Sequence, residues 1–162
     1  MNSLPYQCEM QADGEPFLYP NEEIYTRTND VAFLDETQNV KIYEGTAMVT
    51  THRIIYIKDN KGLQVPIAYI KKYEKEGGLF SNPRIEVHID QIKLQQKLMY
   101  ISEYYTKILE RPVPDCKVNF GSTIQVHIRK FPNKDSRENF YKMLNEAAKQ
   151  GVWLKPIQSQ KA

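Results

Sequence analysis

The residues best suited to bind a ligand lie in a glycine-rich loop between two predicted strands. In this loop Gly77 and Gly78 are followed by Ser81, Asn82 and Arg84. An arginine presents a planar fork of donors that matches a phosphate, and glycines let backbone amides approach an anion closely. The loop therefore predicts a local site for an anionic group.

Other residues that could do chemistry lack a supporting pattern. His88 and His127 fall on the polar faces of two predicted strands and could be neighbours there, but surface histidines are far commoner than metal sites. Cys116 has no histidine at a patterned spacing, so nothing indicates a cysteine nucleophile. The chain also lacks a Walker loop and the GxGxxG and GxSxG motifs. We therefore expect no enzyme, no cofactor and no metal ion.

Composition narrows the class of protein further. The 162 residues suit one domain, and 22 Lys+Arg against 20 Asp+Glu give a net charge of +2. This balance argues against nucleic acid as the partner, because such proteins carry a strongly basic surface. Cys8 and Cys116 are too few for a disulfide framework, which favours a reducing compartment. No signal peptide or run of 18 apolar residues occurs, so we expect a cytosolic or peripheral membrane protein.

The elements that must position the loop are mainly short strands. Alternating and β-branched residues predict strands at 24–28, 31–35, 39–44 joined almost directly to 45–50, 53–58, 63–70, 84–90 and 123–129. Asp59 and Asn60 open a turn that predicts a hairpin, and the first 20 residues read as loop with at most an edge strand. About seven strands followed by one helix predict a small barrel or sandwich closed by that helix.

Capping residues at both ends and an apolar stripe along one face predict the closing helix. Asp135 and Glu138 have the spacing of a capping box, and Gly151 is placed to end the helix, after which 152–154 can fold back. Arg137 is expected to face water with the other charged residues of the helix. The apolar stripe predicted to close one mouth of the barrel consists of Phe140, Leu144 and Ala147.

One segment does not belong to the small barrel. Residues 91–110 contain no Gly or Pro, and a helical apolar pattern runs through Leu94, Leu98, Ile101, Tyr105 and Ile108. This predicts an amphipathic helix within an insertion at about 91–121. The helix either packs over the barrel surface or binds a partner or a membrane.

Three groups of residues, in a fixed order along the chain, carry a resemblance to a known family. The groups are Gly45-Thr46 with Thr51-His52-Arg53-Ile54-Ile55-Tyr56, the glycine-rich loop ending at Pro83-Arg84, and Phe140-Tyr141 with Leu144, Glu146 and Trp153, supported by Gly14-Glu15-Pro16-Phe17-Leu18. Together they resemble the GLUE domain, a split pleckstrin-homology fold found at the N-terminus of the vacuolar protein sorting subunit of the ESCRT-II complex. The resemblance implies one domain over 1–156, a tail or linker at 157–162, and an excised N-terminal part of a longer subunit.

What the resemblance implies is an adaptor that lies on endosomes. Such domains bind 3-phosphoinositides during the sorting of ubiquitinated cargo into multivesicular bodies, so the implied partners are endosomal membranes, ubiquitin and other ESCRT-II and ESCRT-I subunits. The implied localisation is cytoplasmic and peripheral on endosomal membranes. The implied lipid site joins the glycine-rich loop to the turn before the helix and comprises Gly77, Gly78, Ser81, Asn82, Arg84, Arg129, Lys130 and Lys134.

The lipid loop departs from the pattern of its relatives. Relatives tend to carry a cation two places before the proline, whereas this chain has Ser81 there and Asn82 at the usual serine position. One phosphate contact is then missing. The lysines at 71, 72 and 75 either compensate or form a solvated charge run. Arg84 likewise either contacts lipid or pairs with a nearby carboxylate.

Ubiquitin binding could use two routes in this family. Zinc fingers inserted in the domain are ruled out here because the chain has no Cys-x-x-Cys pair. The other route uses the closing helix, where Tyr141, Met143 and Ala148 either contact ubiquitin or belong to the core. The alternative function is a pleckstrin-homology-like or GRAM-like protein-interaction scaffold that binds no lipid.

Overall fold

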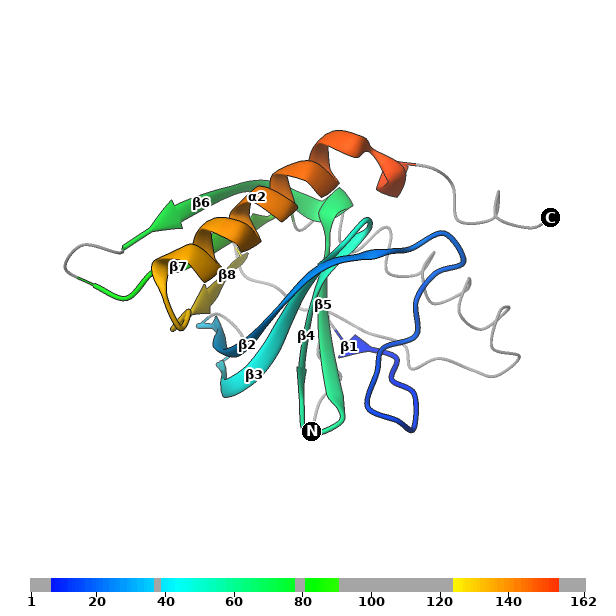
Figure 1. Ribbon diagram of the computed structural model, residues 1–162, viewed down its shortest axis with the longest axis horizontal. Coiled ribbons are helices and arrows are strands. Elements are labelled where there is room, and N and C mark those ends of the chain that lie inside the picture. The colour runs from blue at the N-terminus through cyan, green and yellow to red at the C-terminus, as the bar shows by residue number, and fades with distance from the viewer. Residues whose placement is uncertain (1–6, 37–38, 78–80, 91–123, 155–162) are drawn as a thin grey trace.

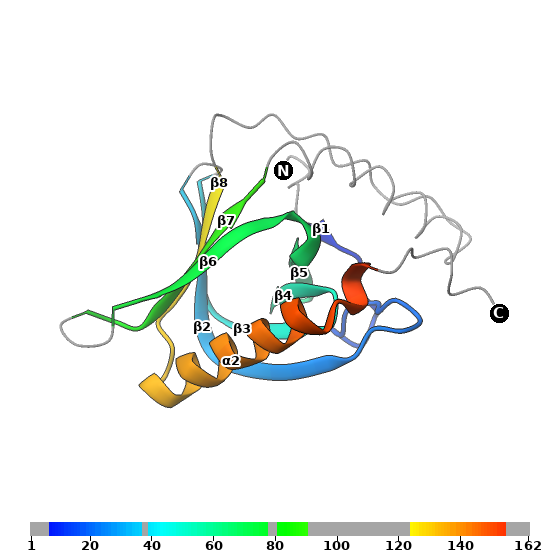
Figure 2. The same cartoon turned by 90° about the horizontal axis from the view of Figure 1, so that it is seen from above.

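The computed structural model describes residues 7–36, 39–77, 81–90 and 124–154. Within them, eight strands form one antiparallel sheet in the order β1-β5-β4-β3-β2-β8-β7-β6. The sheet curves around a core, and one helix, α2, lies across its end (Figures 1 and 2). The bounds are β1 (Gln7–Cys8), β2 (Ile24–Asp35), β3 (Val40–Thr50), β4 (Arg53–Lys58), β5 (Lys61–Pro66), β6 (Ile70–Glu76), β7 (Arg84–Ile89), β8 (Ile124–Arg129) and α2 (Lys134–Gln150).

The described residues confirm the predicted mainly β domain with a C-terminal helix. The sheet has eight strands against about seven predicted, because the edge strand β1 and the missed strand β6 are added, while the strands predicted at 24–28 and 31–35 form one strand, β2. The predicted helix at 91–110 and the rest of the insertion at 91–121 lie outside the described residues, as does the tail at 157–162.

The first long strand, β2, differs from the prediction. The residues expected to separate two strands instead form a bulge inside one strand of 12 residues. Asp30 has a left-handed backbone, with φ 59°, and the pairing with β3 shifts between Thr28 and Val31. A bulge bends a strand without ending it, so turn-forming residues here signal curvature rather than a loop.

The hairpin of β4 and β5 is confirmed, but the predicted end of its second strand is wrong. Asp59 and Asn60 both have positive φ and connect the paired Lys58 and Lys61, as a tight two-residue turn requires. The strand predicted at 63–70 ends at Pro66, and Ile67–Tyr69 forms a short 3₁₀ turn. The chain then changes direction into β6, whose existence the sequence pattern did not indicate.

Helix α2 ends at the predicted residue, but its N-terminal cap differs from the predicted one. Gly151 adopts φ 71° and caps the C-terminus as expected. At the N-terminus, however, Asn133 is the cap, because its Oδ1 accepts from the backbone N–H of Ser136 at 2.8 Å. The capping box expected from Asp135 is therefore wrong by two residues. Within the predicted fold-back, Trp153 packs against the core and donates to the carbonyl of Ala148 at 3.3 Å.

The core lies between the sheet and α2. The predicted stripe is confirmed, because Phe140, Leu144 and Ala147 are completely buried. On the strand side, Ile85, Val87 and Ile89 of β7 face this core while the alternate residues are half-buried. The sheet and helix therefore bury their apolar faces against each other, as period-2 and period-3.6 patterns require.

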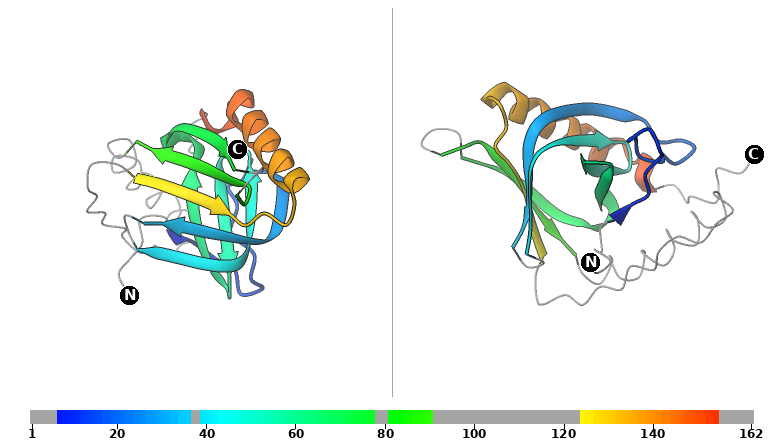
Figure 3. Two further views of the ribbon diagram at one scale, coloured as in Figure 1. Left: turned by 90° about the vertical axis from the view of Figure 1, so that its left-hand side faces the viewer. Right: turned by 90° about the horizontal axis from the view of Figure 1, so that it is seen from below.

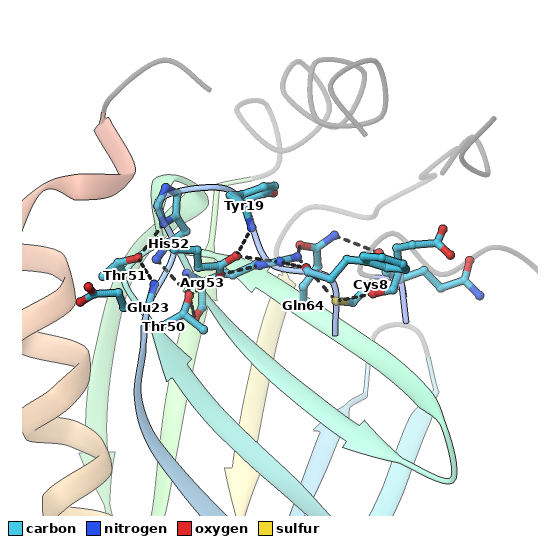
Figure 4. Close-up of polar contacts among 12 residues, drawn as sticks. Cys8, Tyr19, Glu23, Thr50, Thr51, His52, Arg53 and Gln64 are labelled. Carbon is cyan, nitrogen blue, oxygen red and sulfur yellow. Dashed lines mark hydrogen bonds and ion pairs between the residues drawn. The ribbon is translucent and has the colours of Figure 1, made fainter. Parts of the chain in front are cut away.

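A buried ion pair ties the segment before β2 to the sheet (Figure 4). The guanidinium of Arg53 is fully buried, and its Nε and Nη2 donate to the two carboxylate oxygens of Glu22, each at 2.9 Å. Its Nη1 donates to Oε1 of Gln64 at 2.8 Å, and its Cζ lies 4.5 Å from the centre of the Tyr19 ring. A buried charge needs such partners, so this network fixes the early chain against β4 and β5.

Candidate anion-binding surface

The connection between β6 and β7 requires glycine where it begins. Gly77 has φ 74°, and a Cβ added there would lie 2.4 Å from the carbonyl oxygen of Asn82 and 2.9 Å from Oγ of Ser81. Ser81 and Asn82 are exposed, and Gly78 lies outside the described residues. The two ends of the loop therefore approach each other more closely than a side chain would permit.

The first turns of α2 are attached to this hairpin. Arg137 donates through Nη1 to the carbonyl of Glu76 at 2.8 Å and to that of Arg84 at 3.4 Å. Lys75 pairs with Glu138 at 2.9 Å. The expectation that Arg137 faces water is therefore wrong: it is 4% exposed, because its guanidinium satisfies carbonyls at the end of the hairpin. The strand ends that flank the glycine-rich loop are thereby attached to the start of the helix.

Arg84 is paired with carboxylates on its own hairpin. Its Nε lies 3.1 Å from Oε2 of Glu86, and its Nη2 lies 4.0 Å from Oε1 of Glu76. Its side chain remains one quarter exposed. Of the two interpretations left open by the sequence, the carboxylate pairing is present in the structure, and phosphate contact stays a prediction.

The remaining predicted cations lie at the end of β8 and the start of α2. Ile85 pairs with Ile128, which places Arg84 beside Arg129. Lys130 follows with φ 60°, and its Nζ lies 5.0 Å from the ring centre of Tyr43. Lys134 is the first residue of α2 and is exposed. The structure thus brings the cations of β7, β8 and the β8–α2 turn to one end of the sheet.

The lysines of β6 make different contacts, and compensation for the missing phosphate contact stays a prediction. Lys71 and Lys72 are exposed, and Lys72 pairs with Glu74 at 3.2 Å on the same strand. Lys75 instead joins Glu138 of α2 and lies 4.9 Å from the ring centre of Tyr141. The first two behave as a solvated run, whereas Lys75 fastens the hairpin to the helix.

His127 lies among charged groups on the outer face of the sheet. Its Nδ1 accepts from Nε of Arg129 at 3.1 Å. Burial and the charge of Arg129 lower the pKa of His127 below its usual 6.5, Arg84 lowers it further, and Glu86 and Glu36 oppose the shift. The imidazole is therefore held in its neutral form, in which Nδ1 can accept a hydrogen bond.

Acidification is expected to destabilise the fold through this histidine and through His52, whose pKa is also lowered, chiefly by burial. A lowered folded-state pKa means that the unfolded chain takes up protons first. The stability from both groups is complete above the unfolded value of 6.5 and is lost as pH falls below it. Urea unfolding between about pH 8 and pH 5 measures the slope. The double variant His52→Gln with His127→Gln should flatten it, and an unchanged slope would refute this assignment.

The residues predicted for ubiquitin lie at the margin of the core. Tyr141, Met143 and Ala148 are each half-buried and pack against the buried cluster. Tyr141 also meets Tyr73 edge to face, with ring centres 5.6 Å apart. These side chains expose only part of their surface, and ubiquitin binding through them stays a prediction.

The described part of the chain offers no cluster of three His, Cys, Asp or Glu side chains that could hold a metal ion. His88 is paired with Gln125 and His127 with Glu86 across β7 and β8, which makes the histidines diagonal neighbours. Cys116 lies outside the described residues. Among the helices described, none is long and apolar enough to cross a bilayer.

Sequence comparison identifies the family. The profile of vacuolar protein sorting protein 36 (Vps36) of ESCRT-II matches residues 9–91, just over half of the chain. The chain belongs to the Vps36 family. It is similar to vacuolar protein-sorting-associated protein 36 of Dictyostelium discoideum, with 37% identity over 58 residues. That match covers 36% of this chain and 10% of the relative, so the chain spans only a small part of that protein's length.

Solved structures show the same fold. The structure described as the Vps36 N-terminal PH domain superposes with a TM-score of 0.57 and 17% identity, covering 90% of this chain and 94% of that chain. A chain of the 8S snRNP assembly intermediate gives a TM-score of 0.52 and 8% identity, covering 82% and 87%. Together with the Vps36 profile, this confirms the resemblance to the GLUE domain, a PH-like and non-catalytic family.

Tyr43 is the residue of this surface that sequence reasoning missed. It lies on β3, distant in sequence from the cations it adjoins. Its signal was the alternation of Val40 and Ile42 with Lys41 and Tyr43, which places the last two on the outer face. Nothing in that alternation, however, indicates that Lys130 lies against the ring.

Proposed function

We propose that this Vps36 domain is an endosomal sorting adaptor of ESCRT-II that binds 3-phosphoinositides in multivesicular body sorting. The observation that carries the proposal is the convergence of Arg84, Arg129, Lys130 and Lys134 at one end of the sheet. The site lies beside the Gly77 turn and the first turn of α2. We further propose that it has no catalytic activity and is cytoplasmic.

The electrostatics of Arg84 determine how a phosphate would bind. Glu76 and Glu86 neutralise part of its charge, and a phosphate must compete with these carboxylates. Phosphate carries more charge than a carboxylate and accepts from the same guanidinium fork, so the exchange is chemically reasonable. Each nearby cation contributes about 1 kcal/mol at an anionic leaflet, which predicts weak, reversible attachment.

Co-sedimentation with liposomes containing phosphatidylinositol 3-phosphate tests the proposal. Replacing Arg84 with glutamine is expected to weaken binding about fivefold, with a larger effect at low salt. The matched control is Arg27→Gln, because Arg27 is also ion-paired, with Glu15, but belongs to β2. Equal binding by wild type and Arg84→Gln would remove Arg84 from the site. A wild-type protein that binds no such liposome would overturn the lipid proposal and favour a protein-interaction scaffold.

A second variant distinguishes a direct contact between Arg84 and phosphate from an effect of the domain's net charge. Glu86→Gln removes the carboxylate closest to Arg84. If Arg84 contacts phosphate, releasing it should strengthen binding, and combining Glu86→Gln with Arg84→Gln should cancel most of the gain. A gain that persists in the double variant would show that only net charge matters.

The wider context is also a proposal. We propose that residues 1–156 form one domain with an insertion at about 91–121, followed by a tail or linker at 157–162. Other ESCRT-II and ESCRT-I subunits are the proposed protein partners, since the family is that of an ESCRT-II subunit. Ubiquitin remains a further candidate partner for the margin of α2.

A further inference from the structure

Two large apolar side chains are exposed among the described residues, and one of them adjoins the proposed lipid site. Tyr43 is 45% exposed and Leu18 is 38% exposed. The Nζ of Lys130 lies 5.0 Å from the ring centre of Tyr43, within the range of a cation–π contact. Lys130 belongs to the turn that joins β8 to α2, so the exposed ring is next to a predicted lipid-binding cation.

The strand register places this contact near the two arginines. Arg84 is beside Arg129, and Arg129 pairs with Ala32 of β2. Val31 pairs with Gly45 and Phe33 with Ile42, so Ala32 lies opposite Tyr43 and Glu44 at a bulge in the β2–β3 pairing. Figure 3 (left) shows the four strands β7, β8, β2 and β3 side by side. Tyr43 therefore lies one strand beyond the Ala32–Arg129 pair, on the side of the sheet where Lys130 reaches its ring.

The charge around the ring favours an anionic partner. Lys41 is exposed two residues before Tyr43, on the same face of β3. Lys58 reaches across from β4 and donates through Nζ to the carbonyl of Glu44 at 3.3 Å. Lys130 contacts the ring itself, while Lys41 and Lys58 add positive charge on the neighbouring part of β3 and β4.

We propose that Tyr43 and Lys130 form a membrane-contacting pair, in which the ring enters the headgroup region of an anionic bilayer beside the arginines. A tyrosine suits this position because its body is apolar and its hydroxyl stays hydrated, and lysines extend their amines past such a surface. This inference rests on the proposed lipid function. It adds a contact with the bilayer itself, which recognition of a soluble headgroup does not need.

The test compares vesicles with a soluble headgroup. Tyr43→Ala is expected to bind phosphatidylinositol 3-phosphate vesicles about tenfold more weakly than wild type, because the bilayer no longer buries part of an aromatic ring. Binding of soluble inositol 1,3-bisphosphate, measured by calorimetry, should be unchanged. The matched control is Leu18→Ala, which removes the other exposed apolar side chain and should leave both measurements unchanged.

Three outcomes would overturn the inference, and they differ from one another. If Tyr43→Ala binds vesicles as Leu18→Ala does, the ring does not touch the bilayer. If it loses vesicle and headgroup binding equally, Tyr43 acts by positioning Lys130. If wild type binds neither ligand, the proposed function fails together with this inference.

Fluorescence provides an independent check of ring depth. A Tyr43→Trp variant should be quenched by lipids brominated on their acyl chains more strongly than a Leu18→Trp variant. Wild type, which contains Trp153 alone, supplies the background for both. Equal quenching of the two variants would contradict insertion at Tyr43.

Discussion

Replacing Glu22 with glutamine is expected to lower the free energy of unfolding by about 3–5 kcal/mol. The neutral amide leaves the fully buried guanidinium of Arg53 without its counter-charge. Burial would by itself raise the pKa of Glu22, but the charge and hydrogen bonds of Arg53 hold that pKa below 4.5. The carboxylate is therefore ionised in the folded protein, and removing its charge removes the whole ion pair from the free energy of unfolding.

Urea denaturation followed by circular dichroism measures this effect. The control is Arg27→Gln, which breaks an ion pair whose side chains are about two-fifths exposed and should cost about 0–1 kcal/mol. Combining Glu22→Leu with Arg53→Met removes both buried charges and should destabilise less than Arg53→Met alone. A Glu22→Gln protein as stable as Arg27→Gln would show that the buried pair contributes nothing.

Replacing Gly45 with alanine is expected to destabilise the fold by about 3 kcal/mol. A Cβ at this position would lie 2.4 Å from both Cζ and the hydroxyl oxygen of Tyr56, and 2.8 Å from the carbonyl oxygen of Ile57. The Tyr56 hydroxyl accepts from the Gly45 N–H at 2.9 Å and donates to the Val31 carbonyl at 2.7 Å. Moving the ring away would break both bonds in a buried site, which adds their cost to the steric one.

The matched control for Gly45 is another strand glycine. At Gly62 the nearest atom to an added Cβ is Sδ of Met10, at 2.6 Å. A methionine end is flexible and can move, so Gly62→Ala should cost clearly less than Gly45→Ala. Thermal unfolding of the two variants compares them directly. Equal costs would mean that Tyr56 can relocate without penalty.

Local patterns in the sequence determined much of the fold. Alternation at Ile85, Val87 and Ile89 fixed the inner face of β7, and the turn at Asp59-Asn60 fixed a hairpin. The apolar spacing of α2 fixed the face that closes the barrel. These features succeed because strands, tight turns and amphipathic helices depend on residues close in sequence.

Local patterns failed where two local solutions compete. Asn133 and Asp135 are both good helix caps, and the structure uses the first. Turn formers at Thr28 to Asp30 are compatible with a loop or a bulge, and pairing on both sides of β2 selects the bulge. The end of β5 at Pro66 similarly depends on tertiary structure, because β6 pairs with β7 and not with β5.

The sequence by itself determined the family, the fold class and which cations to consider for the anion site. Only the tertiary structure decided their partners: Arg84 with Glu76 and Glu86, and Lys130 with Tyr43. Some strand neighbours in this sheet are far apart in the chain, such as β2 and β8, which bring Lys130 towards β3. Contacts across them follow from the register of pairing, which no periodicity within a single strand specifies.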